Sequence, residues 1–251
     1  MTGYALAMPA KKRLDILLVE RGLAESRSQA QALVLAGRVK GHSKAGEQVE
    51  ESALLEVAPG TRFVSRGGEK LAAALEAFGL EVAGEDCLDV GASTGGFTDC
   101  LLQAGAARVI ALDVGYGQLH PKLREDPRVT VLERTNVRDL RCEDLPFRPS
   151  FVVCDVSFIG LAKALPPALA CAAPGWRGVV LVKPQFEAGP ADVGKGGVVR
   201  DPEVHRRVVD EVVAQAPEWG ARVLGVEPSP LLGPKGNREF LVALADAAGG
   251  P

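Results

Sequence analysis

The chain reads CLDVGASTGGFT from Cys87 to Thr98. A short apolar run from Cys87 to Val90 ends in small residues, and a helical pattern with apolar residues at 97, 101 and 102 follows. This order predicts a strand, a tight glycine-rich turn and a helix, an arrangement in which backbone N–H groups can approach a ligand closely. A second apolar run ends at Asp113, where a carboxylate can accept hydrogen bonds from ribose hydroxyls. The stretch therefore favours a ligand that contains a nucleoside.

Two residues argue against a dinucleotide. Ser93 stands where the G-x-G-x-x-G fingerprint has the glycine that lets a pyrophosphate approach. Asp89 lies inside the strand, and a carboxylate there favours a cationic ligand. The pattern D-V-G-x-S-x-G-G-F resembles the S-adenosylmethionine (SAM) loop of Rossmann-like methyltransferases, although a purely structural turn is the alternative. The resemblance implies a set of cofactor-binding residues: Asp89, Gly91, Ser93, Thr94, Gly95, Gly96, Phe97, Thr98, Asp113, Asn136 and Asp155.

Composition sets the outer bounds. The 251 residues suit one full α/β domain plus a small module, with a hydrophobic fraction ordinary for a soluble protein. We find no apolar run of the roughly 18 residues that a membrane helix needs, and residues 1–10 lack the apolar core of a signal peptide and are expected to be flexible. The five cysteines form no C-x-x-C pair, which predicts neither a zinc site nor a disulfide framework and favours a reducing cytoplasm.

Residues 11–60 predict a separate α+β module. Leucines at 14, 17, 18 and 23 indicate a first short helix, and Ser26 is placed to cap a second helix that Gly37 closes. Short β segments around Val39, Val49 and 54–57 follow. Between residues 11 and 44 there are eight Lys and Arg but only three Asp and Glu, whereas the whole chain has a net charge of −3. This segregation suggests a basic face for a phosphate backbone, with a solvated helical hairpin as the alternative.

The module also carries an extended sequence pattern. A pattern that begins at Arg13 resembles the S4-like RNA-binding domain. It reads R-L-D-x-x-L-x-x-x-G-L-x-x-S-R-x-x-A-x-x-L-x-x-x-G-x-V. By that resemblance the second helix faces structured RNA. The candidate RNA-binding residues are Arg13, Ser26, Arg27, Gln29, Gln31, Arg38 and Lys40.

A linker at 61–66 leads to a second domain at 67–251. Its first helix is expected from Lys70 to Phe78. A lysine in the first turn is electrostatically unfavourable and usually points to solvent, although this unfavourable position also suggests a functional role. Strands are predicted at 87–91, 108–113, 129–133, 151–155, 178–183, 221–227 and 239–245, and helices at 96–105, 116–124, 161–173 and 202–216. This alternation predicts a doubly wound α/β sheet, and seven strands suit the Rossmann-like methyltransferase fold with its last strand antiparallel. Residues 185–200 are the longest candidate for an unstructured, mobile loop.

Polar residues stand at the ends of successive predicted strands. Asp155 and Lys183 each follow a fully apolar run, and Asn136 comes just after the third strand, where it could hold an adenine or cap a turn. Ligands bind at the carboxyl ends of the strands in such sheets, so these side chains predict a site. An antiparallel last strand would return Glu239 to the same edge. The order Lys70, Asp155, Lys183, Glu239 then resembles the catalytic tetrad of the FtsJ-like ribose 2′-O-methyltransferases.

From residue 11 to about 245 the chain resembles the TlyA family, S4-domain rRNA methyltransferases also called the haemolysin A family. The matching motifs are the S4-like pattern, R-F-V-S-R-G-G-E-K, D-V-G-A-S-T-G-G-F-T, C-D-V-S-F-I, V-K-P-Q-F-E and K-G-N-R-E-F. Phe63 is a departure, because the best-known members carry Trp there. The resemblance implies SAM-dependent 2′-O-methylation of cytidine in 23S rRNA and, in some members, also in 16S rRNA. It implies ribosomal subunits as partners, and neither a metal nor a membrane.

The chemistry gives each tetrad residue a role. Methyl transfer from a sulfonium needs alignment and an activated oxygen rather than a metal, and a neutral amine can take the proton of a ribose hydroxyl. Lys183 is the candidate for that role, with Lys70 and Asp155 positioning it and Glu239 orienting a lysine and the hydroxyl.

Two alternative functions remain, a non-catalytic RNA-binding or ribosome-assembly factor and a membrane-active haemolysin. Because the second domain is acidic, an RNA enzyme would need basic residues on the site rim, and the candidates are Lys163, Lys195, Arg200, Arg206, Arg207, Lys235 and Arg238.

Overall fold

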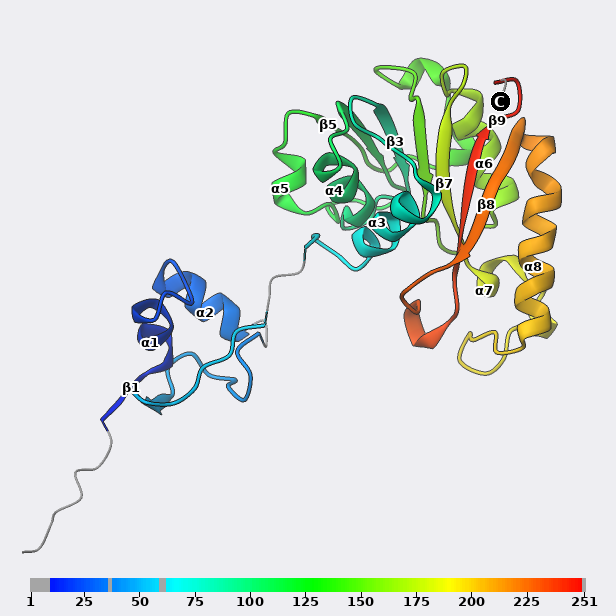
Figure 1. The fold of residues 1–251 in the computed structure, drawn as a ribbon. Coiled ribbons are helices and arrows are strands. Elements are labelled where there is room, and N and C mark those ends of the chain that lie inside the picture. Colours follow the sequence, from blue (N-terminus) through cyan, green and yellow to red (C-terminus); the bar gives the residue numbers. More distant parts are fainter. Residues whose placement is uncertain (1–9, 36–37, 59–61, 250–251) are drawn as a thin grey trace, which may run out of the picture. The chain divides into compact units, whose positions relative to one another are not determined.

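The computed structural model describes residues 10–35, 38–58 and 62–249 (Figure 1). The chain divides into two compact units, residues 1–60 and 61–251. Two sequence predictions fall outside the described residues: the flexible start, apart from Ala10, and the closing glycine of the second helix, Gly37.

The first unit is a small α+β module. It consists of β1 (Lys11–Arg13), α1 (Leu14–Glu20), α2 (Arg27–Leu35) and β2 (Gln48–Glu50), with β1 and β2 antiparallel. The predicted apolar positions of both helices form its core together with Val39, Val49 and Leu55. The hydroxyl of Ser26 accepts a hydrogen bond from Gln29 N at 3.2 Å, as a helix cap does. The first helix ends before Leu23, because Gly22 takes a left-handed conformation with φ of 68°.

The second unit is built on a seven-stranded sheet in the order β5-β4-β3-β6-β7-β9-β8. The strands are β3 (Asp86–Val90), β4 (Arg108–Leu112), β5 (Val129–Leu132), β6 (Phe151–Cys154), β7 (Arg177–Val182), β8 (Ala221–Pro228) and β9 (Phe240–Asp246). Each predicted strand is present, with bounds that differ by at most one residue. The last strand, β9, runs antiparallel to both of its neighbours, β7 and β8, and this confirms the predicted methyltransferase-type sheet.

Helices cover both faces of this sheet (Figure 1). Alternate strand residues pack against α6 (Leu161–Ala170) and α8 (Pro202–Gln215) on one face, and against α3 (Gly67–Phe78) and α4 (Gly96–Gln103) on the other. The remaining helices are α5 (Pro121–Arg124) and α7 (Pro184–Glu187), with 3-10 turns at Val137–Asp139, Cys142–Asp144, Pro190–Asp192, Ala216–Trp219 and Pro234–Gly236. This layering leaves the carboxyl ends of the parallel strands for a site.

Two local predictions in this unit were wrong. The helix expected at 116–124 covers only Pro121–Arg124, because Gly117 is left-handed and Pro121 supplies a helix start. The loop expected at 185–200 is ordered, since it contains α7, a 3-10 turn and a bridge between Gly194 and Val198. The side chain of Asn237 holds this loop through Val199 N and Gly197 O.

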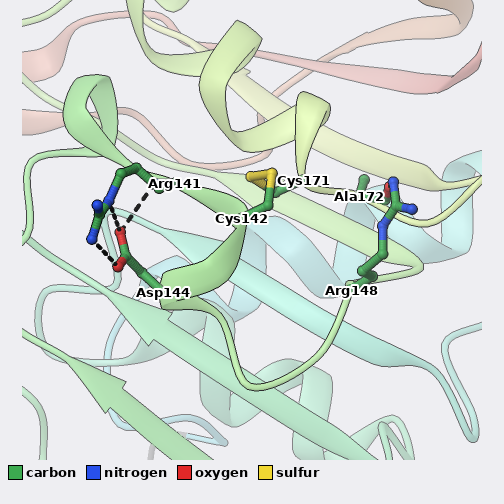
Figure 2. Close-up of a disulfide and its surroundings, with 6 residues drawn as sticks. All are labelled: Arg141, Cys142, Asp144, Arg148, Cys171 and Ala172. Carbon is green, nitrogen blue, oxygen red and sulfur yellow. Dashed lines mark hydrogen bonds and ion pairs between the residues drawn. A yellow bond between two sulfur atoms is a disulfide. The ribbon is translucent and has the colours of Figure 1, made fainter.

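A disulfide joins Cys142 to Cys171, contrary to the prediction of no disulfide framework (Figure 2). It links the turn before β6 to the end of α6. Beside it, Arg148 Nη2 donates to Ala172 O at 2.7 Å, a second connection between the same two segments. The spacing of 29 residues contains no pairing signal, because the two segments meet only through the packing of α6 on the sheet.

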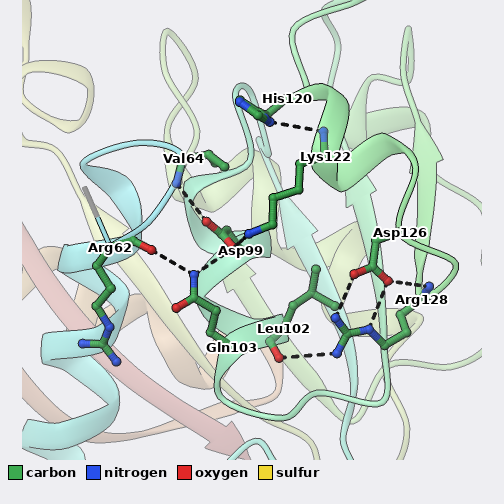
Figure 3. A network of polar contacts seen from close by, with 9 residues as sticks. All are labelled: Arg62, Val64, Asp99, Leu102, Gln103, His120, Lys122, Asp126 and Arg128. Atoms are coloured by element: carbon green, nitrogen blue, oxygen red, sulfur yellow. Dashed lines mark hydrogen bonds and ion pairs between the residues drawn. The ribbon is translucent and has the colours of Figure 1, made fainter. Parts of the chain in front are cut away.

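The start of the second unit is fixed to α4 by a polar network (Figure 3). Asp99 accepts from Val64 N at 2.8 Å, and Gln103 Nε2 donates to Arg62 O at 3.0 Å. The side chain of Phe63 is buried against Gly68, whose missing Cβ leaves the space for it. Most of the segment predicted as a linker, residues 61–66, is therefore packed into the second unit from Arg62 onward.

Candidate active site

Two adjoining cavities open at the carboxyl ends of β3, β4, β6 and β7. Their volumes are about 720 and 710 Å³. Gly91, Ser93, Asp155 and Ser157 line both of them. A ligand in one cavity can therefore meet a ligand in the other at this shared wall.

The first cavity contains the groups predicted to hold a nucleoside. Asp113 and Asn136 both line it. The Asp113 carboxylate accepts from Ser93 N at 2.8 Å and from Gly115 N at 2.6 Å, which fixes its position and leaves lone pairs for further donors. Asn136 Oδ1 accepts from Arg138 N at 3.1 Å, so this side chain caps the following turn while it lines the cavity.

The glycines of the glycine-rich turn have different surroundings, since some line the cavities and others pack against neighbouring side chains. Gly91 lines both cavities with φ of 85°, and a Cβ there would lie 2.7 Å from Asp155 O. Gly95 also has a positive φ, but its Cβ would collide with Leu123 at 2.3 Å, and it lines neither cavity. Thr94, Gly96 and Phe97 line the second cavity. Among the predicted loop residues, Gly91 and Ser93 are thus the ones that reach both cavities.

Asp89 and Thr98 are fully buried and line neither cavity. Thr98 Oγ1 donates to Asp89 Oδ2 at 2.6 Å, which connects β3 to α4. Burial raises the pKa of the Asp89 carboxyl to about 7, against the opposing effect of the Thr98 hydrogen bond. The structure thus places this pair between a strand and a helix, behind the turn.

The second cavity is lined by two buried lysines, Lys70 and Lys183. A lysine at a helix start usually points to solvent, but the Lys70 ammonium group is paired with the buried Glu239 carboxylate, its predicted companion in the tetrad. Gly233 lines the same cavity, and a Cβ there would lie 2.0 Å from Glu239 Oε1. This ion pair joins the first turn of α3 to the residue directly before β9 and explains why a lysine is stable at a helix start.

Lys183 belongs to a second pair. Its Nζ lies 2.5 Å from Asp155 Oδ1 and donates to Ser157 Oγ at 3.0 Å. The structure therefore brings the predicted tetrad together as two lysine–carboxylate pairs, Lys70–Glu239 and Lys183–Asp155. Glu239 lies behind the wall of the second cavity, and the other three residues line it. Sequence reasoning missed Ser157, although its position two residues after Asp155, beyond a strand end, was a usable signal.

In the first unit, three of the candidate RNA-binding residues converge on one buried acid. Asp15 is fully buried and accepts from Arg13, Arg27 and Gln31, each at about 2.9 to 3.0 Å. The Arg13 guanidinium, followed by Gln31 and Arg27, holds the pKa of this carboxyl far below its usual range. Asp15 was not singled out from the sequence.

The other candidates in this unit are also engaged. Ser26 and Gln29 bond to the backbone at the start of α2, and Arg38 donates to Ala58 O at 2.7 Å. Lys40 pairs with Glu56 at 2.5 Å. Over residues 11–60 there are eight Lys and Arg and seven Asp and Glu, so the positive charge of 11–44 is largely offset by the following acids.

The proposed rim cations are only partly near the cavities. Lys163 lines the first cavity. Arg206 and Arg207 instead pair with Glu203 and Asp192. In the described ranges no helix is long and apolar enough to cross a membrane. Nor does a group of three or more His, Cys, Asp or Glu suited to a metal occur among the residues that the structure covers.

Comparisons with known proteins match both units. The profile of the FtsJ-like methyltransferases matches residues 63–246, and that of the S4 domain matches residues 12–40. The chain is 50% identical to the 16S/23S rRNA (cytidine-2′-O)-methyltransferase TlyA of Mycobacterium tuberculosis over 94% of this chain and 91% of that protein. It is 43% identical to Hemolysin A of Brachyspira hyodysenteriae over 91% of this chain and 98% of the relative.

Solved structures agree with these matches. A Streptococcus thermophilus protein named as a hemolysin superposes with a TM-score of 0.75 at 44% identity, covering 96% of this chain and 90% of that one. Aeropyrum pernix fibrillarin, solved with bound SAM, superposes with a TM-score of 0.50 at 16% identity, covering 70% of this chain and 75% of that one. This more distant likeness concerns the fold alone.

Proposed function

This chain belongs to the FtsJ-like methyltransferase family, and from that premise we propose that it transfers a methyl group from SAM to the ribose 2′-hydroxyl of a cytidine in ribosomal RNA. The relatives named above support this substrate, since one of them is named as a 16S/23S rRNA (cytidine-2′-O)-methyltransferase. Either ribosomal subunit is a candidate partner, the large one through its 23S rRNA or the small one through its 16S rRNA. We expect the reaction in the cytoplasm, where ribosomal RNA is found.

The residues of the first cavity fit SAM. Asp113 offers a fixed carboxylate for ribose hydroxyls, and Asn136 lines the same wall. Gly91 leaves the backbone open at the shared wall, and Asp155 supplies negative charge there for a cationic ligand. When bound, SAM would supply the methyl group on its positively charged sulfur. The volume of about 720 Å³ is in the range of small-molecule sites.

The second cavity would accept the target ribose. A 2′-hydroxyl is a weak acid, so a base must take its proton in or near the transition state. Lys183 is our candidate for that base, because it lines this cavity beside the shared wall and is fixed by Asp155. Lys70, fixed by Glu239, would contribute a positive charge near the developing oxyanion.

The S4 domain would supply affinity for RNA. Its exposed α2 residues, Arg27 and Gln31, are held at defined positions by the buried Asp15 and keep donors for phosphate oxygens. A fixed guanidinium loses less side-chain entropy when it binds a phosphate than a freely rotating one does. Contacts within the module and RNA contacts are therefore compatible roles for these side chains.

One observation carries the proposal: two lysine–carboxylate pairs flank a single cavity that shares its wall with the glycine-rich turn. The test is to incubate the full chain with ribosomal subunits and SAM labelled in its methyl group, and then to digest the RNA to nucleosides. The proposal expects label in 2′-O-methylcytidine. Label in a base-methylated nucleoside, or SAM binding without any transfer to RNA, would contradict 2′-O-methylation as the function of this site.

A further inference from the structure

Ser157 is a polar residue of the site that the tetrad does not include. It lies on the segment after β6, two residues beyond Asp155, and lines both cavities. Its hydroxyl oxygen accepts a hydrogen bond from Lys183 Nζ at 3.0 Å, while Asp155 Oδ1 lies 2.5 Å from the same nitrogen. Lys183 is only 8% exposed. Two oxygens thus face the amine of one buried lysine.

The number of these acceptors matches the hydrogens of a neutral amine. An ammonium group has three N–H donors, and loss of a proton leaves two N–H bonds and one lone pair in a tetrahedral arrangement. The Ser157 hydroxyl accepts a hydrogen bond from Nζ, while the 2.5 Å contact with Asp155 Oδ1 is an ion pair without hydrogen-bond geometry. If the neutral amine turns one N–H bond toward each of these two oxygens, its lone pair has one remaining direction. Because Lys183 lines the cavity proposed for the ribose, that direction is available to an incoming hydroxyl.

We propose that Ser157 is a positioning residue that orients the lone pair of neutral Lys183 toward the ribose 2′-hydroxyl. This role rests on the proposed function, in which Lys183 accepts the hydroxyl proton. With Asp155 alone as acceptor, the amine could rotate about its Cε–Nζ bond and place an N–H bond where the lone pair is needed. The second acceptor removes this freedom.

Two contacts connect the segment of Ser157 to the segment that follows Lys183. Phe158, which follows Ser157, is exposed and has a left-handed backbone with φ of 67°. Its ring packs at 5.1 Å, between centroids, against Phe186. Glu187 Oε1 accepts from Leu161 N at 2.9 Å. Since Phe186 and Glu187 belong to α7, which follows Lys183 directly, these two contacts connect the segment after Ser157 to the segment after Lys183.

The alternative is that Ser157 is a solvent-facing residue whose contact with Lys183 has no effect on the reaction. Ser157→Ala distinguishes the two in single-turnover methylation with saturating SAM and ribosomal RNA. We expect the rate to fall by about 10- to 100-fold, the cost of a misplaced reacting group. The affinities for SAM and RNA should stay unchanged. Ser157→Thr keeps the hydroxyl and should recover most of the rate.

A pH profile separates orientation from protonation. If Ser157 orients the lone pair, the factor lost in Ser157→Ala should be the same from about pH 6 to about pH 9. A factor that disappears at the high end would instead mean that Ser157 acts on the proton occupancy of the amine, and this would overturn the proposal. Ser150→Ala is the matched control, since it removes a hydroxyl that hydrogen-bonds at the opposite end of β6. This control should keep the wild-type rate.

The remaining outcomes are equally decisive. Wild-type activity in Ser157→Ala, or a Thr variant as slow as the Ala variant, would overturn the positioning role and leave the proposed function intact. A loss of SAM affinity in step with the rate would assign Ser157 to cofactor binding instead. A wild-type chain that binds SAM but methylates no ribosomal RNA would overturn the proposed function and this role together.

Discussion

At the scale of single residues, Lys183 can act either as a base or as a fixed positive charge. Lys183→Arg separates the two, because a guanidinium stays charged and cannot accept a proton. We expect both Lys183→Arg and Lys183→Ala to lose about 10²- to 10⁴-fold in single-turnover rate, the usual contribution of a general base. SAM and RNA binding should persist. Substantial activity in the arginine variant would leave Lys183 as an electrostatic clamp.

Substitution of Asp113 tests whether the first cavity binds the nucleoside of SAM. Asp113→Ala should weaken SAM binding by about 1–3 kcal/mol, because the ribose hydroxyls lose their acceptor. Part of the loss will come from the turn itself, since Ser93 N and Gly115 N lose the same partner. Calorimetric titration with SAM measures the change. Asp126→Ala is the matched control, since it removes a carboxylate that pairs with Arg128 and accepts from Arg128 N but lines neither cavity. Equal affinity in all three proteins would move the nucleoside elsewhere.

The buried carboxyl of Asp89 should make the stability of the fold depend on pH. This carboxyl has a pKa of about 7 in the folded chain, above its ordinary value of 3.8, because burial disfavours the charge. The folded state therefore keeps a proton that the unfolded state releases, so stability falls as pH rises from about 4 to about 7. The shift is worth about 4 kcal/mol as an upper bound. Asp89→Asn removes this carboxyl, and urea unfolding should show its stability relative to wild type increasing over that interval. A difference in stability between the variant and the wild type that does not change with pH would contradict a raised pKa of Asp89.

At the scale of elements, the disulfide is the feature with the clearest consequence. Cys142 and Cys171 close a loop of 29 residues between the turn before β6 and the end of α6. Chain entropy predicts a stabilisation of about 3–4 kcal/mol for a loop of this length. Reductant should lower the urea midpoint of the wild type and leave that of Cys142→Ser unchanged. An equal response of both proteins would mean that the bond does not contribute to stability.

The sequence predicted the strands well and the connections less well. An apolar run such as 178–182 is a local signal, because a strand buried on both faces needs continuous apolar residues. The order of residues 185–200 depends instead on Asn237, a contact across about forty residues that no local pattern contains. The Lys70–Glu239 pair was anticipated only by resemblance to a family, since 169 residues separate its partners.

At the scale of the whole molecule, the two units have separate cores, and we predict that they divide binding from chemistry. A fragment that begins at Thr61 keeps the sheet, both cavities and the network around Asp99. It should bind SAM like the full chain and lose most of its RNA affinity and methylation. Because phosphate contacts release counterions, RNA binding by the full chain should weaken steeply with salt. Full methylation by the fragment would refute the division.

The candidate RNA-binding residues of the first unit were predicted one by one, but their shared contacts were not. The S4 pattern was correct about the domain, as the match to residues 12–40 shows. It did not reveal that Arg13, Arg27 and Gln31 share one buried carboxylate, because a pattern of spacings does not say which side chains converge. Charge counting over 11–44 also left out the acids that follow, and these pair with Lys12 and Lys40.

Methylation of ribose in ribosomal RNA by this chain can be tested in cells by mapping the 2′-O-methyl positions of the RNA. Ribosomal RNA would be compared from cells with the gene, without it, and without it but complemented by the wild-type or the Lys183→Ala chain. We expect at least one cytidine whose 2′-O-methyl group is lost on deletion, restored by the wild type and not restored by Lys183→Ala. Identical maps in all four strains would contradict it.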